Sequence, residues 1–127
     1  MKEEDKKLLL KDLSTRLPYG VKAYVKNWSK LDRKYYEGVY TVESTHPSIN
    51  IVLACSDKGS VEVIVGYYDY VIKPYLFPMS EMTEEQYNQY VKYSAIESID
   101  WLNKSHFDYR GLIEKGLAID ATNLNIY

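Results

Sequence analysis

The sequence predicts an α+β protein of a single domain, residues 1–127: an N-terminal helix, a four- to five-stranded antiparallel meander or small half-open barrel, and C-terminal helices. Two observations predict this class. Apolar residues recur at helical spacing before residue 18 and after residue 82, whereas between residues 20 and 72 they alternate with polar residues. In addition, 46% of the residues are apolar and 27% are charged, an ordinary balance for one globular domain.

Residues 3–16 are predicted to form an amphipathic helix. Acidic residues open its first turn and Arg16 lies near its end, and both placements suit the helix dipole. The leucines at helical spacing, which are expected to face the core, are Leu9, Leu10, Leu13 and Leu17. The Pro-Tyr-Gly sequence at residues 18–20 then ends the helix in a turn.

Short strands with tight connections are predicted at residues 21–28, 35–44, 49–55, 61–65 and 68–72. In the first strand, Val21, Ala23 and Val25 are expected to face the core. Gly59 can supply the positive φ angle of a hairpin between the third and fourth strands. Pro74 is expected to end the fifth strand, because proline cannot donate to a ladder.

Two capping boxes mark helices in the C-terminal third of the chain. Thr83 with Gln86 predicts one helix start, and Ser94 with Glu97 predicts another. The spacing leaves open whether the first helix continues through Trp101 or restarts after Ser94. The apolar residues that these helices are expected to bury are Tyr87, Tyr90, Val91, Ile96, Ile99 and Leu102.

The following segment combines a helix signal with a tight closure. Asp108 is the expected N-cap of a short helix over residues 109–115. Gly116 suits the left-handed position after that helix, so Leu117 would fold back in a Schellman-type closure. Residues 118–127 either dock as a short extended piece or fray.

Several motifs along the chain carry a resemblance to known sequences. They are residues 8–13, 16–22, 73–76, 78–85 and 101–118. These motifs resemble a family of small uncharacterised proteins from anaerobic gut bacteria and their phages or mobile elements, and the last motif is the most specific. The family has no established activity. The resemblance therefore implies a provenance and assigns no role to any residue.

Residues 21–36 concentrate positive charge. They include five basic residues and one acid, Asp32, although the whole chain has a net charge of −2. Lysines alternating with aromatic rings on one strand face suit single-stranded nucleic acid, because phosphates meet the cations and bases stack on the rings. An edge strand protected by lysines gives the same pattern. The candidate binding residues are Lys22, Tyr24, Lys26, Trp28, Lys30, Arg33 and Lys34.

A second candidate site consists of His106, Asp108 and Arg110, which alternate in sequence. A Cys55 thiol with a histidine base oriented by a carboxylate would be a coherent nucleophilic site. However, Cys55 falls on an apolar strand face, where a small buried residue is expected. The other residues of that face are Ile49, Ile51 and Leu53. Capping by Asp108 and backbone hydrogen bonds from the other two side chains are the alternative, so the sequence leans against an enzyme.

Neither a metal nor a cofactor is expected. His46, His106 and Asp108 could contribute to a metal site, but the chain has no paired-cysteine, HExxH or EF-hand spacing. Residues 111–116 end without the lysine that a phosphate-binding loop requires.

Tyrosine is unusually frequent, with 14 residues in the chain. An aromatic cluster at residues 67–70 and 73–78 either packs the sheet against the helices or forms a protein interface, since tyrosine is enriched at interface cores. The expected function is therefore non-enzymatic: a binding or adaptor protein that contacts a protein partner or forms a homodimer. Single-stranded nucleic-acid binding is the alternative.

A cytoplasmic location without membrane contact is expected. The single cysteine excludes an internal disulfide, and the charged residues 1–7 do not resemble a signal peptide. The longest apolar run, residues 51–55, is far shorter than the ~20 residues that span a bilayer.

Overall fold

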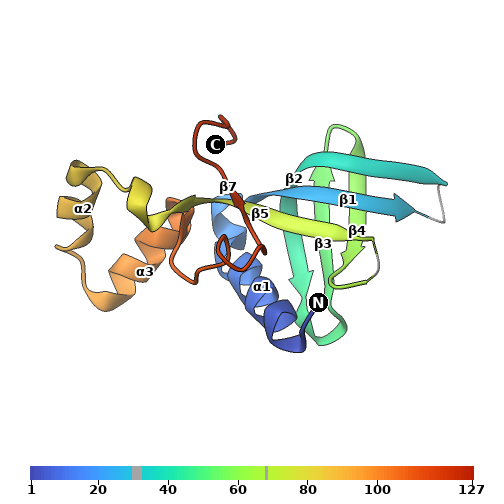
Figure 1. Ribbon diagram of the computed structural model, residues 1–127, viewed down its shortest axis with the longest axis horizontal. Coiled ribbons are helices and arrows are strands. Elements are labelled where there is room, and N and C mark those ends of the chain that lie inside the picture. The colour runs from blue at the N-terminus through green and yellow to red at the C-terminus, as the bar shows by residue number, and fades with distance from the viewer. Residues whose placement is uncertain (30–32, 68) are drawn as a thin grey trace.

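The chain folds into an N-terminal helix, a mixed sheet and C-terminal helices (Figure 1), which confirms the predicted α+β class. The computed structural model describes residues 1–29, 33–67 and 69–127. The helices are α1 (Glu3–Arg16), α2 (Glu84–Tyr90) and α3 (Ala95–Lys104), with short 3-10 turns at Leu17–Tyr19, Pro47–Ile49 and Met79–Glu81. The strands are β1 (Lys22–Ser29), β2 (Lys34–His46), β3 (Ile51–Ser56), β4 (Gly59–Ile64), β5 (Val71–Pro78), β6 (Phe107–Asp108) and β7 (Ile119–Asp120).

The sheet is mixed and has seven strands within the described residues, in the order β4-β3-β2-β1-β5-β6, with β7 also paired to β5. Strands β1 to β5 pair antiparallel, whereas β6 and β7 each run parallel to β5. The prediction of a purely antiparallel meander with four or five strands is therefore wrong. Both additional strands are two residues long and come from the C-terminal segment, and such short pieces leave no periodic pattern in the sequence.

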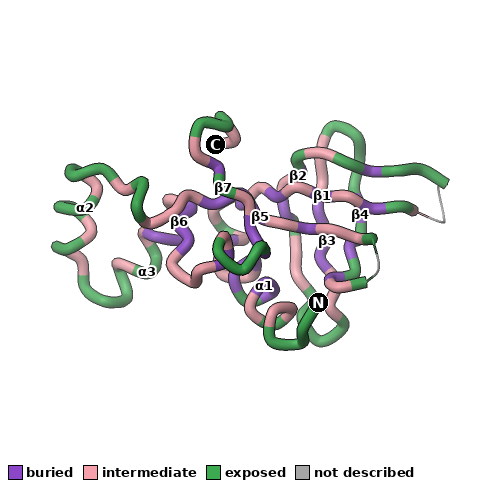
Figure 2. The backbone as a smooth tube through the Cα atoms, viewed as in Figure 1, coloured by how far each residue is buried: buried purple, intermediate pink, exposed green. Residues whose placement is uncertain are grey.

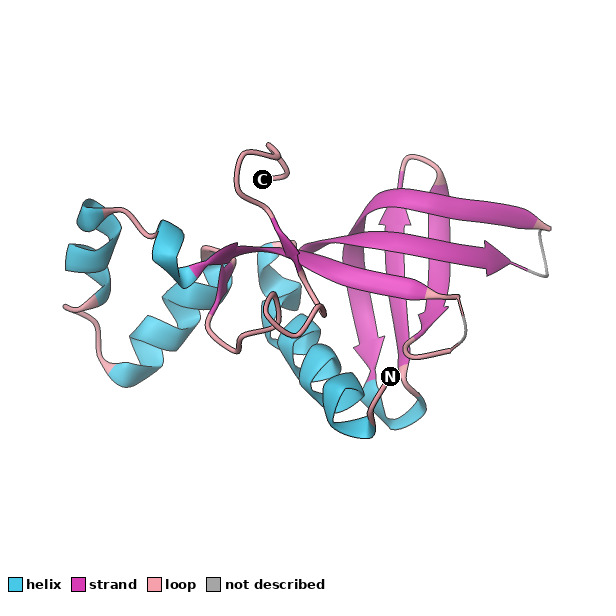
Figure 3. Ribbon diagram, viewed as in Figure 1, coloured by secondary structure: helices cyan, strands magenta, loops and turns pink. Residues whose placement is uncertain are grey.

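The sheet curls so that β4 approaches β1. The side-chain amide of Asn27 on β1 donates to the carbonyl oxygen of Glu62 on β4 at 3.0 Å. A bulge between Val42 and Ser44 interrupts the β2–β3 ladder, and bulges bend strands. Figure 3 shows β3 and β4 running across β1 and β5, so the strands enclose a core between them.

The core lies between α1 and the curled sheet (Figure 2). The predicted stripe of α1 is confirmed for Leu9, Leu10 and Leu13, which are buried, while Leu17 is partly buried. The residues of this core in the strands or directly beside them are Val21, Ala23, Val25, Tyr36, Tyr40, Val42, Val52, Ala54, Val61, Val63, Val65 and Ile72. The predicted inward face of β1 is thus confirmed.

Strand β5 continues through Pro74, which corrects the prediction that this proline ends the strand. Pro74 lies opposite Ala23, and the preceding residues Ile72 and Lys73 pair with β1. Beyond the proline, Tyr75 pairs with β7 and Phe77 pairs with β6. One missing donor is tolerated because pairs on both sides of the proline hold the strand.

Both predicted capping boxes are present, and the helix restarts rather than continues. The hydroxyl of Thr83 accepts from the Gln86 backbone amide, and that of Ser94 accepts from the Glu97 backbone amide. The predicted burial is confirmed only for Leu102. The residues that are not buried are Tyr87, Tyr90, Val91, Ile96 and Ile99.

Residues 109–115 form turns instead of the predicted short helix. The closure is nevertheless as expected: Gly116 has a φ of 73°, and the Leu117 amide donates to the Leu112 carbonyl at 2.9 Å. The C-terminal segment docks rather than frays. The hydroxyl of Tyr127 donates to the Tyr75 carbonyl at 2.8 Å and accepts from the Lys22 amide at 2.9 Å.

Candidate functional site

The basic and aromatic residues of β1 lie on its outward face. Burial alternates strictly from Lys22 to Asn27, so the side chains opposite the core are those of Lys22, Tyr24, Lys26 and Trp28. Arg33 and Lys34 are exposed at the start of β2, whereas Lys30 lies outside the described residues. The sequence therefore placed the members of this set on β1 on the correct face. Lys34 lies on the opposite face, because it pairs with Ser29, and its ammonium group lies 5.3 Å from the centre of the buried Tyr36 ring.

The two ends of this outward face differ in their contacts. At one end the ammonium group of Lys22 donates to the Ile126 carbonyl at 3.1 Å, which gives it a structural role. In the middle, the hydroxyl of Tyr24 donates to the carboxylate of Glu37, and this hydrogen bond is the main cause that raises the pKa of the tyrosine to about 12. Glu37 also lies opposite Lys26 in the ladder. The positive charge of the strand is therefore partly balanced.

Aromatic and cationic side chains gather where β1 ends and β2 begins. We call this surface the basic aromatic tip, and it consists of Lys26, Trp28, Arg33, Lys34 and Tyr35. The Trp28 and Tyr35 rings lie 6.3 Å apart and are 44% and 46% exposed. The ammonium group of Lys26 lies 5.9 Å from the centre of the Tyr35 ring, and a hydrogen bond with Tyr35 raises the pKa of this lysine.

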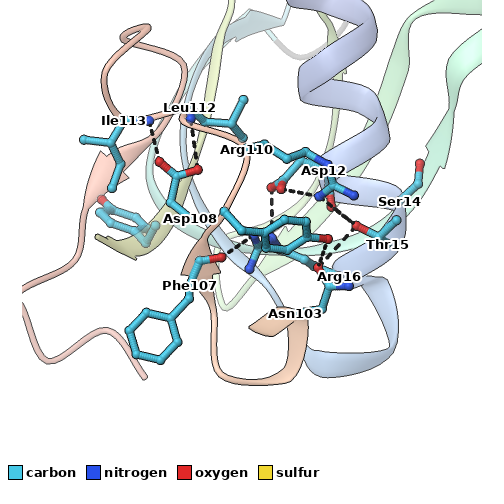
Figure 4. A network of polar contacts seen from close by, with 12 residues as sticks. Asp12, Ser14, Thr15, Arg16, Asn103, Phe107, Asp108, Arg110, Leu112 and Ile113 are labelled. Carbon is cyan, nitrogen blue, oxygen red and sulfur yellow. Dashed lines mark hydrogen bonds and ion pairs between the residues drawn. The ribbon is translucent and has the colours of Figure 1, made fainter. Parts of the chain in front are cut away.

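The side chains of His106, Asp108 and Arg110 point to separate partners (Figure 4 shows the last two). The carboxylate of Asp108 accepts from the backbone amides of Leu112 and Ile113, both at 2.9 Å. Arg110 instead donates to Asp12 on α1 at 2.7 Å. Each of the three side chains thus has a contact that holds the C-terminal segment in place.

A buried ion network joins α1 to the segment around β6 (Figure 4). Asp12 and Arg16 are fully buried, and the Arg16 Nε atom lies 3.0 Å from the Asp12 carboxylate. Arg16 also donates to the Phe107 carbonyl at 2.6 Å. Sequence reasoning missed this network, although Asp12 and Arg16 share a helix face with Leu9 and Leu13 and could have indicated it.

His106 is buried against Tyr127, with the two ring centres 3.6 Å apart and nearly parallel. Burial is the main cause that lowers the pKa of His106 to about 4, and the charges of Arg16 and Lys22 contribute. Its Nδ1 atom has no hydrogen-bond partner among the described residues. Burial against Tyr127 therefore favours the neutral form of the His106 imidazole.

Cys55 lies on the outward face of β3, which corrects the prediction that it is buried. The buried residues of this strand are Val52 and Ala54, whereas Ile51, Leu53 and Cys55 are only partly covered. Both faces of the strand are apolar, so alternation alone did not identify the inner face. A hydrogen bond with Glu43 is the main cause that raises the pKa of the Cys55 thiol, which disfavours the thiolate.

The predicted catalytic partners are not brought together in the described part of the chain, where the interactions of Cys55 and His106 involve different residues. Among the described residues there is also no group of three histidine, cysteine, aspartate or glutamate side chains that could hold a metal ion. His46, at the end of β2, contacts Ser44 at 3.4 Å instead.

A surface that sequence reasoning assigned to the core extends from the body as two helices (Figure 1). We call residues 79–104 the helical arm. In α2, all of whose residues the structure describes, no residue is buried (Figure 2). Tyr87 and Val91 are each 55% exposed, and Ile96 on α3 is 84% exposed. Such large apolar side chains at helical spacing are the signal that marks this surface.

The arm is fixed to the body at its base. The Trp101 ring stacks on Phe107 with the centres 5.6 Å apart, and it contacts Tyr90 and Tyr93 at 6.0 and 6.3 Å. Tyr19, which follows α1, donates to the carboxylate of Asp100 on α3. Between the arm and the body lies a shallow cleft of about 640 Å³. The arm therefore has a defined direction despite its exposed outer helix.

Comparison of the chain with protein-family models, curated proteins and solved structures found no match. None of the helices in the described residues is long and apolar enough to cross a membrane. The helical arm and the basic aromatic tip are therefore assigned a function from their own contacts and exposure.

Replacement of Asp12 by asparagine should lower the free energy of unfolding by about 3 to 5 kcal/mol, because it leaves the buried charge of Arg16 uncompensated. Urea unfolding followed by circular dichroism measures this loss. Glu4→Gln, at an exposed position of the same helix, is the matched control and should change stability by no more than about 0.5 kcal/mol. A similar small effect for both variants would show that the network does not stabilise the fold.

The stability of the protein should fall as the pH is lowered from 6.5 to 4. In this window the unfolded chain binds a proton at His106 that the folded chain, with its pKa of about 4, does not bind. The contribution of His106 to the free energy of unfolding is fully present above pH 6.5 and decreases by at most about 3 kcal/mol on acidification. Urea unfolding across this range should show a smaller pH dependence for His106→Asn than for the wild type.

Asparagine suits this test because it tolerates the positive φ of 62° at position 106. His46→Asn, at an exposed position, is the matched control and should retain the wild-type pH dependence. An equal slope for the wild type and His106→Asn would contradict the prediction.

Proposed function

We propose that the chain is a non-enzymatic protein-binding module whose contact surface is the helical arm. The observation that carries this proposal is the exposure of Ile96, Tyr87 and Val91 on two adjacent helices. Large apolar side chains gathered on one protruding element mark interaction surfaces. A cytoplasmic setting, in which the free thiol of Cys55 stays reduced, is part of the proposal.

The short outer helix supports this assignment. α2 has seven residues, and isolated helices shorter than ~12 residues are marginal in water. Within the chain it is held by its capping box and by the packing of Tyr90 and Tyr93 against Trp101. A partner that covers Tyr87 and Val91 would bury the part of this helix that Trp101 leaves exposed and would stabilise it further.

The charge of the arm defines the chemistry of its partner. The arm carries two lysines and five acidic residues, and the acidic residues are Glu81, Glu84, Glu85, Glu97 and Asp100. Glu84 lies one helical turn before Tyr87, and Asp100 lies one turn after Ile96. The arm is therefore complementary to a surface that combines apolar or aromatic side chains with positive charge.

Photo-crosslinking in cells that express the chain from its own gene tests this proposal. A p-benzoylphenylalanine in place of Ile96 should form a covalent adduct with a protein, because the side chain at this position lies in the contact. The same probe at the exposed Ile49, outside the arm, is the matched control and should form little adduct. Mass spectrometry of the adduct distinguishes a second copy of the chain from another protein.

Tyr87→Ser combined with Val91→Ser in the probe-bearing chain should weaken the contact about tenfold, because truncation of two apolar anchors typically costs more than 1 kcal/mol. The amount of adduct should decrease accordingly. Equal adduct formation at positions 96 and 49, or adduct formation that is insensitive to the double substitution, would contradict the proposal.

Single-stranded nucleic-acid binding by the basic aromatic tip is a second candidate function. It is favoured by the exposed Trp28 and Tyr35 rings beside Lys26, because bases stack on rings while phosphates contact cations. Glu37 opposes it, since this carboxylate lies opposite Lys26 in the ladder. The two effects together make this candidate weaker than protein binding.

A salt-titrated fluorescence assay with a short oligothymidine tests the second candidate. Binding at low salt should weaken with added salt, and Lys26→Ala should reduce the slope of log K against log salt by about 0.7, the value for one phosphate contact. Lys11→Ala, an exposed lysine on α1, is the control and should leave the slope unchanged. No binding at low salt would eliminate this candidate.

A further inference from the structure

We propose that the partner of the helical arm is a second copy of the same chain, and that the arm of one copy binds the basic aromatic tip of the next, head to tail. This inference rests on the proposed function, because it identifies the partner of the same surface. It is carried by the complementary chemistry of two exposed surfaces that the fold places at opposite ends of the molecule.

The position of the two surfaces prevents them from meeting within one chain. In Figure 1, whose horizontal direction is the longest axis, α2 lies at one end, and the end of β1 and the start of β2 lie at the other. The sheet and α1 lie between them. Each copy therefore presents both surfaces outward, and their contact requires two molecules.

The two surfaces match in charge and in apolar content. The arm exposes Tyr87, Val91 and Ile96 among its carboxylates. The tip exposes the rings of Trp28 and Tyr35. Lys26 lies against the Tyr35 ring, and the further cations Arg33 and Lys34 are exposed at the start of β2. Aromatic side chains and arginine are enriched in interface cores, and opposite charges around such a core favour one register of contact.

A two-fold symmetric contact would be less favourable for either surface. Arm against arm would bring together two surfaces with an excess of acidic residues, and tip against tip would bring together two surfaces with an excess of basic residues. Like charges across an interface cost free energy and disfavour that arrangement. A head-to-tail contact avoids both repulsions. It leaves one arm and one tip unoccupied in every open assembly, so the assembly either closes into a ring or continues to grow.

Sedimentation velocity of the purified, nucleic-acid-free full chain is the first experiment. The average mass should increase with protein concentration, and raising the salt from about 50 mM to about 500 mM should reduce it, because screening weakens contacts between opposite charges. A chain that remains monomeric at millimolar concentration in low salt would overturn the proposal.

Two blocked variants then test the direction of the contact. The arm-blocked variant is Tyr87→Ser with Ile96→Ser, and the tip-blocked variant is Trp28→Ala with Tyr35→Ala. Each should associate at least about tenfold more weakly with itself than the wild type does, because each lacks one of the two required surfaces. Mixing them should give a 1:1 complex that does not grow, since one intact arm then meets one intact tip.

Matched variants separate loss of contact from loss of structure. Ile49→Ser with Leu124→Ser removes two exposed apolar side chains outside both surfaces and should associate as the wild type does. Circular dichroism and thermal unfolding check that each blocked variant is folded. Where the tip-blocked variant is unfolded, Arg33→Ser with Lys34→Ser replaces it, because both side chains are exposed.

The outcomes distinguish this inference from the proposed function. Self-association of the tip-blocked variant alone would show an arm-to-arm contact, and failure of the two blocked variants to form a complex would exclude the head-to-tail contact; either result overturns the inference. A monomeric purified chain whose position 96 still crosslinks to a different protein in cells would overturn the inference and support the proposed function. Absence of both self-association and crosslinking would reject both.

Discussion

The buried carboxylate of Asp12 is the interaction on which the arrangement of the whole chain depends. One of its oxygen atoms contacts Arg16 on the same helix, and the other contacts Arg110 in the C-terminal segment. Arg16 in turn binds the Phe107 carbonyl, and Phe107 pairs with β5. A charge in this position is expensive unless its partners are fixed, so the network imposes one relative placement of α1, β5 and the C-terminal segment. The base of the helical arm follows directly from this placement, because α3 ends just before β6.

Local rules predicted those parts of the fold whose causes lie within a few residues. The bounds of α1, both capping boxes and the inward face of β1 depend on neighbouring side chains and were predicted correctly. The strands β6 and β7 depend instead on the ion network and on the docking of Tyr127 against β5, and neither has a local pattern. Pro74 is a further case without a local pattern. Its own sequence predicts the end of a strand, but strand pairing before and after it keeps it within β5.

The candidate surfaces differ in how far the sequence could indicate them. The outward position of the described β1 residues followed from a period of two, whereas the contact of Lys22 with Ile126 is a long-range event. The apolar residues of the arm were predicted to be buried because an amphipathic helix has the same pattern whether its apolar face meets its own core or another molecule. Only the position of the arm outside the body, with Ile96 almost fully exposed, distinguishes the two cases.

A directional contact requires that the arm be rigid at its base and uncovered at its outer end, and the structure meets both conditions. Leu102 and Asn103 are buried at the base, and Trp101 stacks on Phe107 of the strand that the ion network fixes. The entropy that a flexible appendage would lose on binding is therefore largely lost already on folding. Toward the outer end the packing thins, and α2 depends on its cap and on rings that it shares with Trp101. The proposal of a second copy as the partner rests on this preorganised surface and on the complementary charge at the opposite end of the molecule.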